Sequence, residues 1–303
     1  MPSENGKKVL ITGASGFIGQ SIVKKFKKMD QEVFIYDLEK PLITPRKYIK
    51  GDIFDFEKLK EAVNEHDVII HLVGLPQAGI AQKEPAKSFR LNVMSLQNVL
   101  EACRSCGSKK LLFPSSAAVY GITEELPIKE HLFPNPTNIY SWHKYICEEM
   151  VRAYHCNFGL EYVILRLFNV YGKGCKGVIN TFLEIAAKGK TIESFGPYQY
   201  RDFVYAGDVA EAFYKSAMYE KAKNKTINIG SGKGTQIKEI LDLVQEIYPS
   251  TKRVYKKREF VMYDSIADIT LAKILLDYKP HSSKEFMKKI VLEEMRARII
   301  KEI

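Results

Sequence analysis

The feature that most constrains the fold is a glycine-rich turn near the start of the chain. A short apolar run over residues 8–12 is followed by Gly13, Gly16 and Gly19, and then by a helical pattern that continues to Met29. This order predicts a buried strand, a glycine turn and a helix. Because glycine has no Cβ, such a turn lets a pyrophosphate approach backbone N–H groups at the positive end of the helix. The spacing is G-x-x-G-x-x-G instead of G-x-G-x-x-G, so the turn alone is a weak indication of dinucleotide binding.

Acidic residues follow the next two predicted strands. The strand over residues 32–36 ends at Asp37, at the distance expected for the carboxylate that binds an adenosine ribose. A carboxylate there repels a 2′-phosphate and favours NAD over NADP; the alternative is an aspartate that ends a strand at a turn. Asp52 follows a third short strand. It is placed either to meet an adenine amino group or to serve as a turn residue or cap for the helix over 56–64.

Strands and helices continue to alternate beyond this point. The further apolar runs, each of strand length, cover residues 67–73, 111–114 and 162–167. Continuous apolar strands are typical of a parallel sheet that is covered on both faces. The alternation predicts an α/β fold with a doubly wound parallel sheet and right-handed crossovers.

Two helices and one strand end carry the polar residues of most interest. Amphipathic patterns predict a helix over residues 86–106, which contains Asn92, and a helix over 137–157 that starts at the Asn135-Pro136 pair. The strand over 111–114 is followed by Ser115 and Ser116. These serines are expected at the carboxyl edge of the sheet, where ligands of such folds bind.

Tyr140 and Lys144 lie four residues apart in the second of these helices. This spacing places the phenol and the ammonium on one helix face. A phenol with an ordinary pKa of about 10 is a poor base, but a nearby positive charge favours the phenolate and lowers that pKa. The pair is therefore a candidate proton-transfer device, although the same spacing also occurs by chance on solvated helices.

After residue 172 the regular alternation weakens. Helices are expected over 181–188, 209–219, 236–248 and 284–302, with short strands at 191–195 and 225–230. We expect residues 1–170 to form a nucleotide-binding domain, with about 204–230 returning to it, and residues 171–303 to form mainly a smaller α/β substrate-binding lobe. A cleft is expected between the two.

Composition excludes several other classes of protein. The net charge is +10, but the lysines are spread along the chain, and the cluster from Lys252 to Arg258 contains only one aromatic residue, so nucleic-acid binding is not expected. Five cysteines form no disulfide framework, and the Cys103/Cys106 pair has no second pair to complete a metal site. No apolar run is long enough to span a membrane. We expect a cytoplasmic protein without a metal.

The ordered set of motifs resembles the extended short-chain dehydrogenase/reductases, specifically the NAD-dependent nucleotide-sugar epimerase/dehydratase group. The resemblance covers nearly the whole chain. The motifs that carry it are Gly13/Gly16/Gly19, Asp37, Gly51-Asp52, His71-Leu72, Asn92-Val93, Ser115-Ser116, Val119-Tyr120-Gly121, Tyr140/Lys144, Arg166/Asn169/Gly172, Arg201-Asp202-Phe203, Asn228-Ile229-Gly230 and Asp268/Ala272.

The resemblance implies a Rossmann-type fold and a catalytic triad of Ser116, Tyr140 and Lys144. Tyr140 would take the proton from a sugar hydroxyl, Ser116 would hydrogen-bond the same oxygen, and Lys144 would bind the nicotinamide ribose and hold Tyr140 as phenolate. The residues implied in NAD binding are Gly13, Gly16, Phe17, Ile18, Gly19, Asp37, Asp52, Ile53, Leu72, Asn92, Tyr140 and Lys144.

The same resemblance assigns substrate residues. Besides Ser116, it places Asn169, Arg201 and Arg258 at the diphosphate of a nucleotide sugar. Arginine suits this role because its planar fork binds phosphate oxygens in two places. Surface ion pairing is the alternative for each arginine.

Departures from the family pattern narrow the reaction. Ser116 is followed by Ala117 and Ala118, where 4,6-dehydratases have an Asp-Glu pair after threonine, so dehydration is disfavoured. Pro76 stands where close UDP-galactose 4-epimerase relatives have lysine. The leading interpretation is a UDP-hexose 4-epimerase that works through a 4-keto intermediate. The alternatives are an NAD(P)H-dependent reductase or dehydrogenase of a 4-keto-6-deoxy nucleotide sugar, and a dinucleotide sensor without chemistry.

A homodimer is also expected. Trp142, Ile146, Met150 and Ala153 form an apolar stripe on the helix over 137–157. In the family that the chain resembles, this helix and the one over 86–106 pair across a two-fold axis as a four-helix bundle. Ordinary packing on the sheet is the alternative explanation of the stripe.

Overall fold

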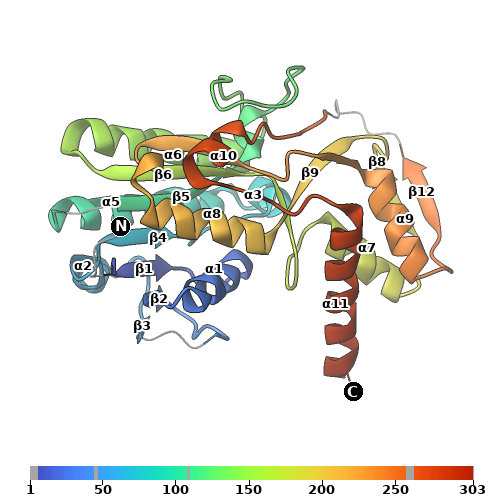
Figure 1. Cartoon of the computed structure of the whole chain (residues 1–303), viewed down its shortest axis with the longest axis horizontal. Helices are drawn as coiled ribbons and strands as arrows, with labels where there is room; N and C mark the ends of the chain where they lie inside the picture. Colours follow the sequence, from blue (N-terminus) through green and yellow to red (C-terminus); the bar gives the residue numbers. More distant parts are fainter. Residues whose placement is uncertain (1–5, 44–46, 108–109, 257–262, 303) are drawn as a thin grey trace.

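A seven-stranded parallel sheet forms the centre of the molecule (Figure 1). The computed structural model describes residues 6–43, 47–107, 110–256 and 263–302. In spatial order the strands are β10 (Lys225–Ile229), β6 (Glu161–Leu167), β5 (Lys110–Ser116), β4 (Val68–His71), β1 (Val9–Thr12), β2 (Val33–Asp37) and β3 (Lys47–Lys50). Every residue of β1 and β4 is buried, as their continuous apolar sequences predict.

Helices cover both faces of this sheet. One face packs against α1 (Phe17–Lys28), α8 (Ala206–Met218) and α10 (Thr270–Leu276). The other packs against α2 (Phe56–Asn64), α5 (Ser95–Ser105) and α6 (Ile139–Phe158). The predicted α/β fold with a doubly wound parallel sheet is therefore confirmed.

A second group of elements has its own hydrophobic core. Figure 1 shows most of these elements gathered beyond one end of the large sheet, on the right of the view. They are β7 (Asn169–Tyr171), α7 (Val178–Ala187), β8 (Ile192–Phe195), β9 (Tyr200–Tyr205), β11 (Gly234–Gln236), α9 (Ile237–Ile247), β12 (Arg253–Lys256) and α11 (Lys284–Glu302). Their shared core includes Leu183, Ile240 and Val291. Because β10 pairs with β6, residues 225–229 belong to the large sheet and not to this group.

The helix expected over residues 86–106 is not regular, and that expectation is corrected. Pro85 begins α4 (Pro85–Phe89), a π-helical turn follows over Arg90–Met94, and α5 then continues to Ser105. The side chain of Asn92 lies inside the π turn and donates to the Ser88 carbonyl at 3.0 Å. The π turn inserts one residue and so shifts the apolar repeat by one position, and over segments as short as α4 and α5 this shift does not stand out from the sequence.

The start of α6 also differs from the expected start at Asn135-Pro136. The helix begins at Ile139, and Asn138 is its N-cap. The Asn138 side chain accepts from the Ser141 amide at 3.0 Å, and the Ser141 hydroxyl accepts from the Asn138 amide at 3.1 Å. This reciprocal capping box fixes the first turn, which contains Tyr140.

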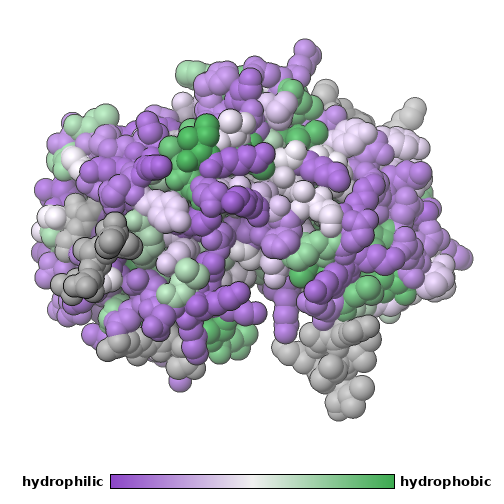
Figure 2. All heavy atoms as spheres, in the orientation of Figure 1, coloured by the Kyte–Doolittle hydropathy of each residue, from purple (hydrophilic) through white to green (hydrophobic). Residues whose placement is uncertain are grey.

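The visible surface is mainly hydrophilic, with small separate apolar patches (Figure 2). Among the described residues, no helix combines the length and the apolar character needed to cross a membrane. In the same part of the chain, no cluster of three or more His, Cys, Asp or Glu side chains could hold a metal ion.

The capping box of α6 leads to a prediction about stability. Asn138→Ala should lower the free energy of unfolding by about 1 kcal/mol, because it leaves the Ser141 amide without its side-chain acceptor. Urea unfolding measures the change. The matched control is Asn157→Ala at the other end of α6, where an exposed amide donates to Ala153 at 2.8 Å; it should change stability by less than about 0.5 kcal/mol. Equal losses for the two variants would contradict the capping role.

Candidate active site

The glycine turn after β1 forms a cradle at the N-terminus of α1. At Gly13, which has φ +75°, a Cβ would lie 2.7 Å from the Val73 amide nitrogen, and at Gly19 it would lie 2.5 Å from the Ala14 carbonyl oxygen. These two glycines are needed for the packing of the turn itself. At Gly16 the nearest atom to a Cβ would be the Gly13 oxygen at 3.6 Å, so the protein does not fill the space in front of it.

Gly16 is also the N-cap of α1, and Phe17, Ile18 and Gly19 form the first turn of that helix. No side chain caps the N–H groups of this end. Free N–H groups and the helix dipole favour an anion at such a position. The cradle therefore fits the pyrophosphate of a dinucleotide.

Asp37 stands beside this turn at the end of β2. Its Oδ2 accepts hydrogen bonds from the Ser15 amide at 2.9 Å and the Ser15 hydroxyl at 2.7 Å, and its Oδ1 accepts from the Glu39 amide at 3.2 Å. The carboxylate thus fastens the glycine turn to β2 and leaves acceptor capacity on Oδ1.

Asp52 and Ile53 follow β3. The structure decides between two of the roles considered for Asp52, a turn residue and the cap of the next helix. The Asp52 carboxylate accepts from the Phe54 amide at 3.0 Å, which makes it a turn residue. The cap of α2 is Asp55, whose side chain accepts from the Lys58 amide at 3.3 Å, so the capping alternative for Asp52 is wrong. Ile53 is 6 % exposed.

Leu72 and Asn92 lie on the far side of the glycine turn. The Leu72 amide donates to the Thr12 carbonyl at 2.8 Å and so continues from β4 alongside the end of β1. Asn92 Oδ1 accepts from the Leu75 amide at 3.1 Å, and its Nδ2 donates to the Ser88 hydroxyl at 3.1 Å. The Asn92 side chain therefore holds the loop after β4 in place.

The structure brings Ser116, Tyr140 and Lys144 together. Ser116 ends β5, Tyr140 lies in the first turn of α6, and Lys144 lies one turn further along. The Ser116 hydroxyl lies close enough to Tyr140 to lower the pKa of its phenol. The Lys144 ammonium donates to the Pro114 carbonyl at 2.8 Å, two residues before Ser116.

Burial dominates the electrostatics of this trio. Burial raises the pKa of Tyr140 to about 12. The nearby Ser116 hydroxyl has a smaller effect in the opposite direction and lowers that pKa. Burial also lowers the pKa of Lys144, and the neighbouring Cys147 and Glu148 oppose that change. Since the ammonium donates to Pro114, the role of Lys144 in holding a phenolate stays a prediction.

The residues assigned to a substrate lie on the paired strands β7 and β9. Asn169 in β7 donates from Nδ2 to the Asp202 carbonyl at 3.2 Å. Arg201 in β9 donates to the Tyr263 carbonyl and, at 3.0 Å, to Gln199 Oε1. Burial lowers the pKa of the Arg201 guanidinium. Arg258 lies outside the described residues.

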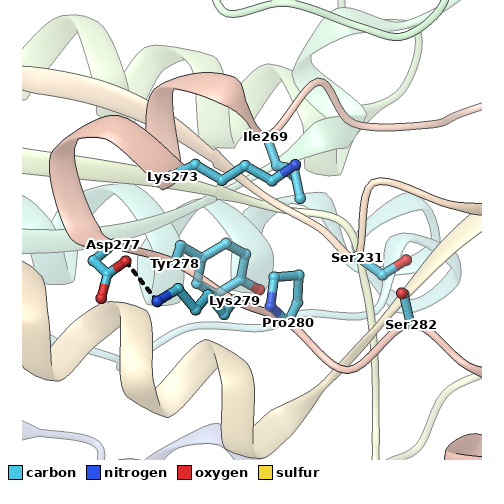
Figure 3. Close-up of a pocket in the computed structure, with 8 residues that line it drawn as sticks. All are labelled: Ser231, Ile269, Lys273, Asp277, Tyr278, Lys279, Pro280 and Ser282. Atoms are coloured by element: carbon cyan, nitrogen blue, oxygen red, sulfur yellow. Dashed lines mark ion pairs between the residues drawn. The ribbon is translucent and has the colours of Figure 1, made fainter.

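A separate surface cavity of about 440 Å³ lies beside α10 (Figure 3). It is lined by Ser231, Ile269, Lys273, Asp277, Tyr278, Lys279, Pro280 and Ser282, none of which belongs to the predicted site. Lys279 and Asp277 form an ion pair at 3.1 Å within it. The Ser231 hydroxyl donates to Asp202 at 2.7 Å, so the cavity adjoins β9.

Sequence reasoning missed a buried polar cluster behind the trio. Glu148 is fully buried on α6 and accepts from Arg166 and from the Ser115 hydroxyl. The available signal was the spacing, because Glu148 continues the four-residue repeat of Tyr140 and Lys144. A charged residue at that position is expected to face solvent unless a buried partner such as Arg166 is known.

Comparison with known proteins agrees with this geometry. Residues 9–230 match the model of the NAD dependent epimerase/dehydratase family. A protein of Methanocaldococcus jannaschii that is provisionally named UDP-glucose 4-epimerase is 37% identical over 300 residues, which cover 93% of this chain and 97% of that protein.

Solved structures agree as well. The UDP-glucose 4-epimerase of Thermotoga maritima, solved with UDP-glucose, superposes with a TM-score of 0.88 at 29% identity, covering 96% of this chain and 99% of that one. The UDP-glucose 4-epimerase of Brucella ovis, solved with NAD, gives a TM-score of 0.88 at 28% identity, covering 94% and 96%. From its sequence match and its fold, the chain belongs to the NAD dependent epimerase/dehydratase family.

Proposed function

We propose that this protein is an NAD-dependent nucleotide-sugar epimerase of the UDP-hexose 4-epimerase type. The observation that carries the proposal is the meeting of Ser116, Tyr140 and Lys144 at the carboxyl edge of the sheet. The family match and the epimerase structures solved with UDP-glucose or NAD support it.

The proposed chemistry places a proton acceptor beside a carbinol carbon. NAD, when bound, supplies the acceptor for the hydride that leaves the sugar C4. Tyr140 accepts the proton of the 4-hydroxyl at its phenol oxygen and later returns it, while Ser116 hydrogen-bonds the same sugar oxygen. Lys144 favours the phenolate through its positive charge. Return of the hydride to the other face leaves no net redox change.

The cofactor would be held by the cradle described above. The N–H groups of the Gly16–Gly19 turn face the pyrophosphate, and Asp37 accepts from the ribose hydroxyls. We assign Asp52 and Ile53 to the adenine side, and Leu72 and Asn92 to the inner side of the same pocket.

On the substrate side, we propose that Asn169, Arg201 and Arg258 contact the diphosphate. Ala117 and Ala118 follow Ser116 and carry no acid or base, which argues against elimination of water. We further propose a nucleotide-binding domain over residues 1–170, to which residues 204–230 return, and a substrate lobe over 171–303. The cytoplasmic location stays a prediction from the sequence.

We also propose a homodimer through α4, α5 and α6. Large apolar side chains on these helices and on the π turn are exposed, with Phe89 at 42 %, Met94 at 48 %, Trp142 at 49 % and Ile146 at 37 %. Both α4 and α5 pack against α6, and we place these side chains on one surface of the three helices. Exposed apolar patches of this kind are typical of protein contacts.

The first prediction concerns turnover. Purified protein that carries NAD should interconvert UDP-glucose and UDP-galactose without added cofactor, and Tyr140→Phe should lower kcat about a hundredfold or more while the variant keeps its NAD. Product analysis and cofactor release by denaturation measure both. Tyr145→Phe on the same helix is the control and should keep its activity. Consumption of one NADH per product would refute epimerisation in favour of a reductase.

The second prediction concerns pH. Burial raises the pKa of Tyr140 to about 12 in the protein without ligand, so the phenol is protonated at neutral pH and its ionisation limits the rate. The value of kcat/KM should therefore rise with pH, by about tenfold per unit below the apparent pKa. Initial rates between pH 5.5 and pH 9 in constant ionic strength test this. A flat profile would exclude Tyr140 as the proton acceptor.

The third prediction concerns the dimer. Trp142→Glu should convert the protein to a monomer, because it places a charge in the proposed apolar contact. Light scattering after size-exclusion chromatography measures the mass. Phe133→Glu is the control, since Phe133 is 84 % exposed but lies outside these helices. A wild-type protein that is already monomeric at micromolar concentration would rule out the proposal.

A further inference from the structure

The end of β5 is joined to α6 at three successive levels. The Pro114 carbonyl accepts from Lys144, the Ser115 hydroxyl donates to Glu148 Oε1 at 2.5 Å, and the Ser116 hydroxyl lies near the Tyr140 phenol. The three helix residues are four apart, so they form one stripe that faces the strand. Two of these contacts involve the catalytic trio, and the third belongs to residues that the proposed chemistry does not use.

Glu148 can hold this third contact because its own position is fixed. Its side chain is 0 % exposed, and Arg166 on β6 binds it with two hydrogen bonds, Nε to Oε1 at 2.9 Å and Nη2 to Oε2 at 2.7 Å. Arg152 adds a third donor to Oε2 at 2.8 Å. A bidentate guanidinium defines both the distance and the direction of a carboxylate. Arg166 is itself held over the Tyr120 ring at 4.6 Å.

The cluster thus connects three elements of the sheet and its covering helix. Ser115 pairs with Arg166 in the register of β5 and β6, and both side chains reach Glu148 on α6. A fixed Ser115 leaves little freedom to Ser116, the next residue. Small displacements of reacting groups lower rates strongly, so a rigid strand end has a catalytic consequence.

Resting on the proposed function, we propose that Glu148 is a positioning residue: held by Arg166 and Arg152, it binds Ser115 and so fixes Ser116 against Tyr140. Its negative charge also faces Lys144. The titratable and charged groups that act on that ammonium are Cys147 and Glu148 on α6 and His71 on β4, with Arg152 and Arg166 behind Glu148; Tyr140 lies one helical turn away.

The test separates the hydrogen bond between Ser115 and Glu148 from the negative charge of Glu148. Ser115→Ala removes this hydrogen bond and leaves Glu148 bound to both arginines. We expect kcat to fall about tenfold with KM and NAD content within twofold of wild type, because only the alignment of Ser116 and Tyr140 is lost. Ser216→Ala is the matched control: Ser216 is a buried serine on α8 whose hydroxyl has no hydrogen-bond partner among the described residues. It should leave kcat unchanged.

Glu148→Gln keeps the shape of the side chain and removes its charge. Lys144 then loses a negative neighbour while the Arg166 guanidinium loses its carboxylate partner, and both changes lower the pKa of Lys144. Above pH 9, where deprotonation of Lys144 ends the rise in rate, the alkaline limb of the pH–rate profile should move to lower pH in this variant and stay in place in Ser115→Ala. A purely structural role of Glu148 would lower the active fraction in both variants without moving the limb, and that result overturns the proposal. Ser115→Ala with a wild-type kcat also overturns it.

Crystal structures test the positioning role of Glu148 even if the proposed activity is absent. If the wild-type protein interconverts no nucleotide sugar, the proposed function fails, but crystal structures of wild type and Ser115→Ala with NAD still report on the geometry. The distance between the Ser116 and Tyr140 hydroxyl oxygens should increase in the variant. An unchanged distance refutes the positioning role.

Discussion

Covering a parallel sheet on both faces is the constraint on which the rest of this structure depends. With α1, α8 and α10 on one face and α2, α5 and α6 on the other, the strands must be apolar along their length. Polar side chains can then reach solvent only where the strands end. The glycine cradle after β1, Asp37 after β2 and Ser116 at the end of β5 all lie at these ends. The site is thus a consequence of how the sheet is buried.

The same constraint explains what could be predicted from the sequence. The strands of the large sheet were recognisable because continuous apolar runs have no other explanation in a chain without membrane-length segments. The π turn at Asn92 and the cap at Asn138 were not recognised, since both depend on hydrogen bonds between side chain and backbone that an apolar repeat does not encode. The Glu148 cluster was missed for a related reason: its partner arginine lies 18 residues away on another element.

Burial also changes how the tyrosine and lysine pair must be understood. From the spacing alone, a lysine one turn away lowers the pKa of a phenol. In the folded protein the larger effect is burial, which raises the pKa of Tyr140 and lowers that of Lys144, so both groups favour their neutral forms. Burial therefore opposes the proton transfer proposed for Tyr140, while the Ser116 hydroxyl acts in the opposite direction and lowers the pKa of the phenol.

A second buried carboxylate lies on β9, next to Arg201, and like Glu148 it is bound by donors from several elements. Asp202 on β9 accepts from the Ser231 amide at 2.6 Å, the Gly232 amide at 2.9 Å and the Ala267 amide at 3.1 Å. It thereby joins β9, the turn after β10 and the segment that precedes α10. Arg201 is the neighbour of Asp202 on β9, so the strand that presents this arginine is held from behind by backbone amides. Glu148 and Asp202 are thus two buried carboxylates whose partners come from several elements, and breaking either set of contacts would leave an unpaired buried charge. That penalty holds the elements around each carboxylate in a single arrangement.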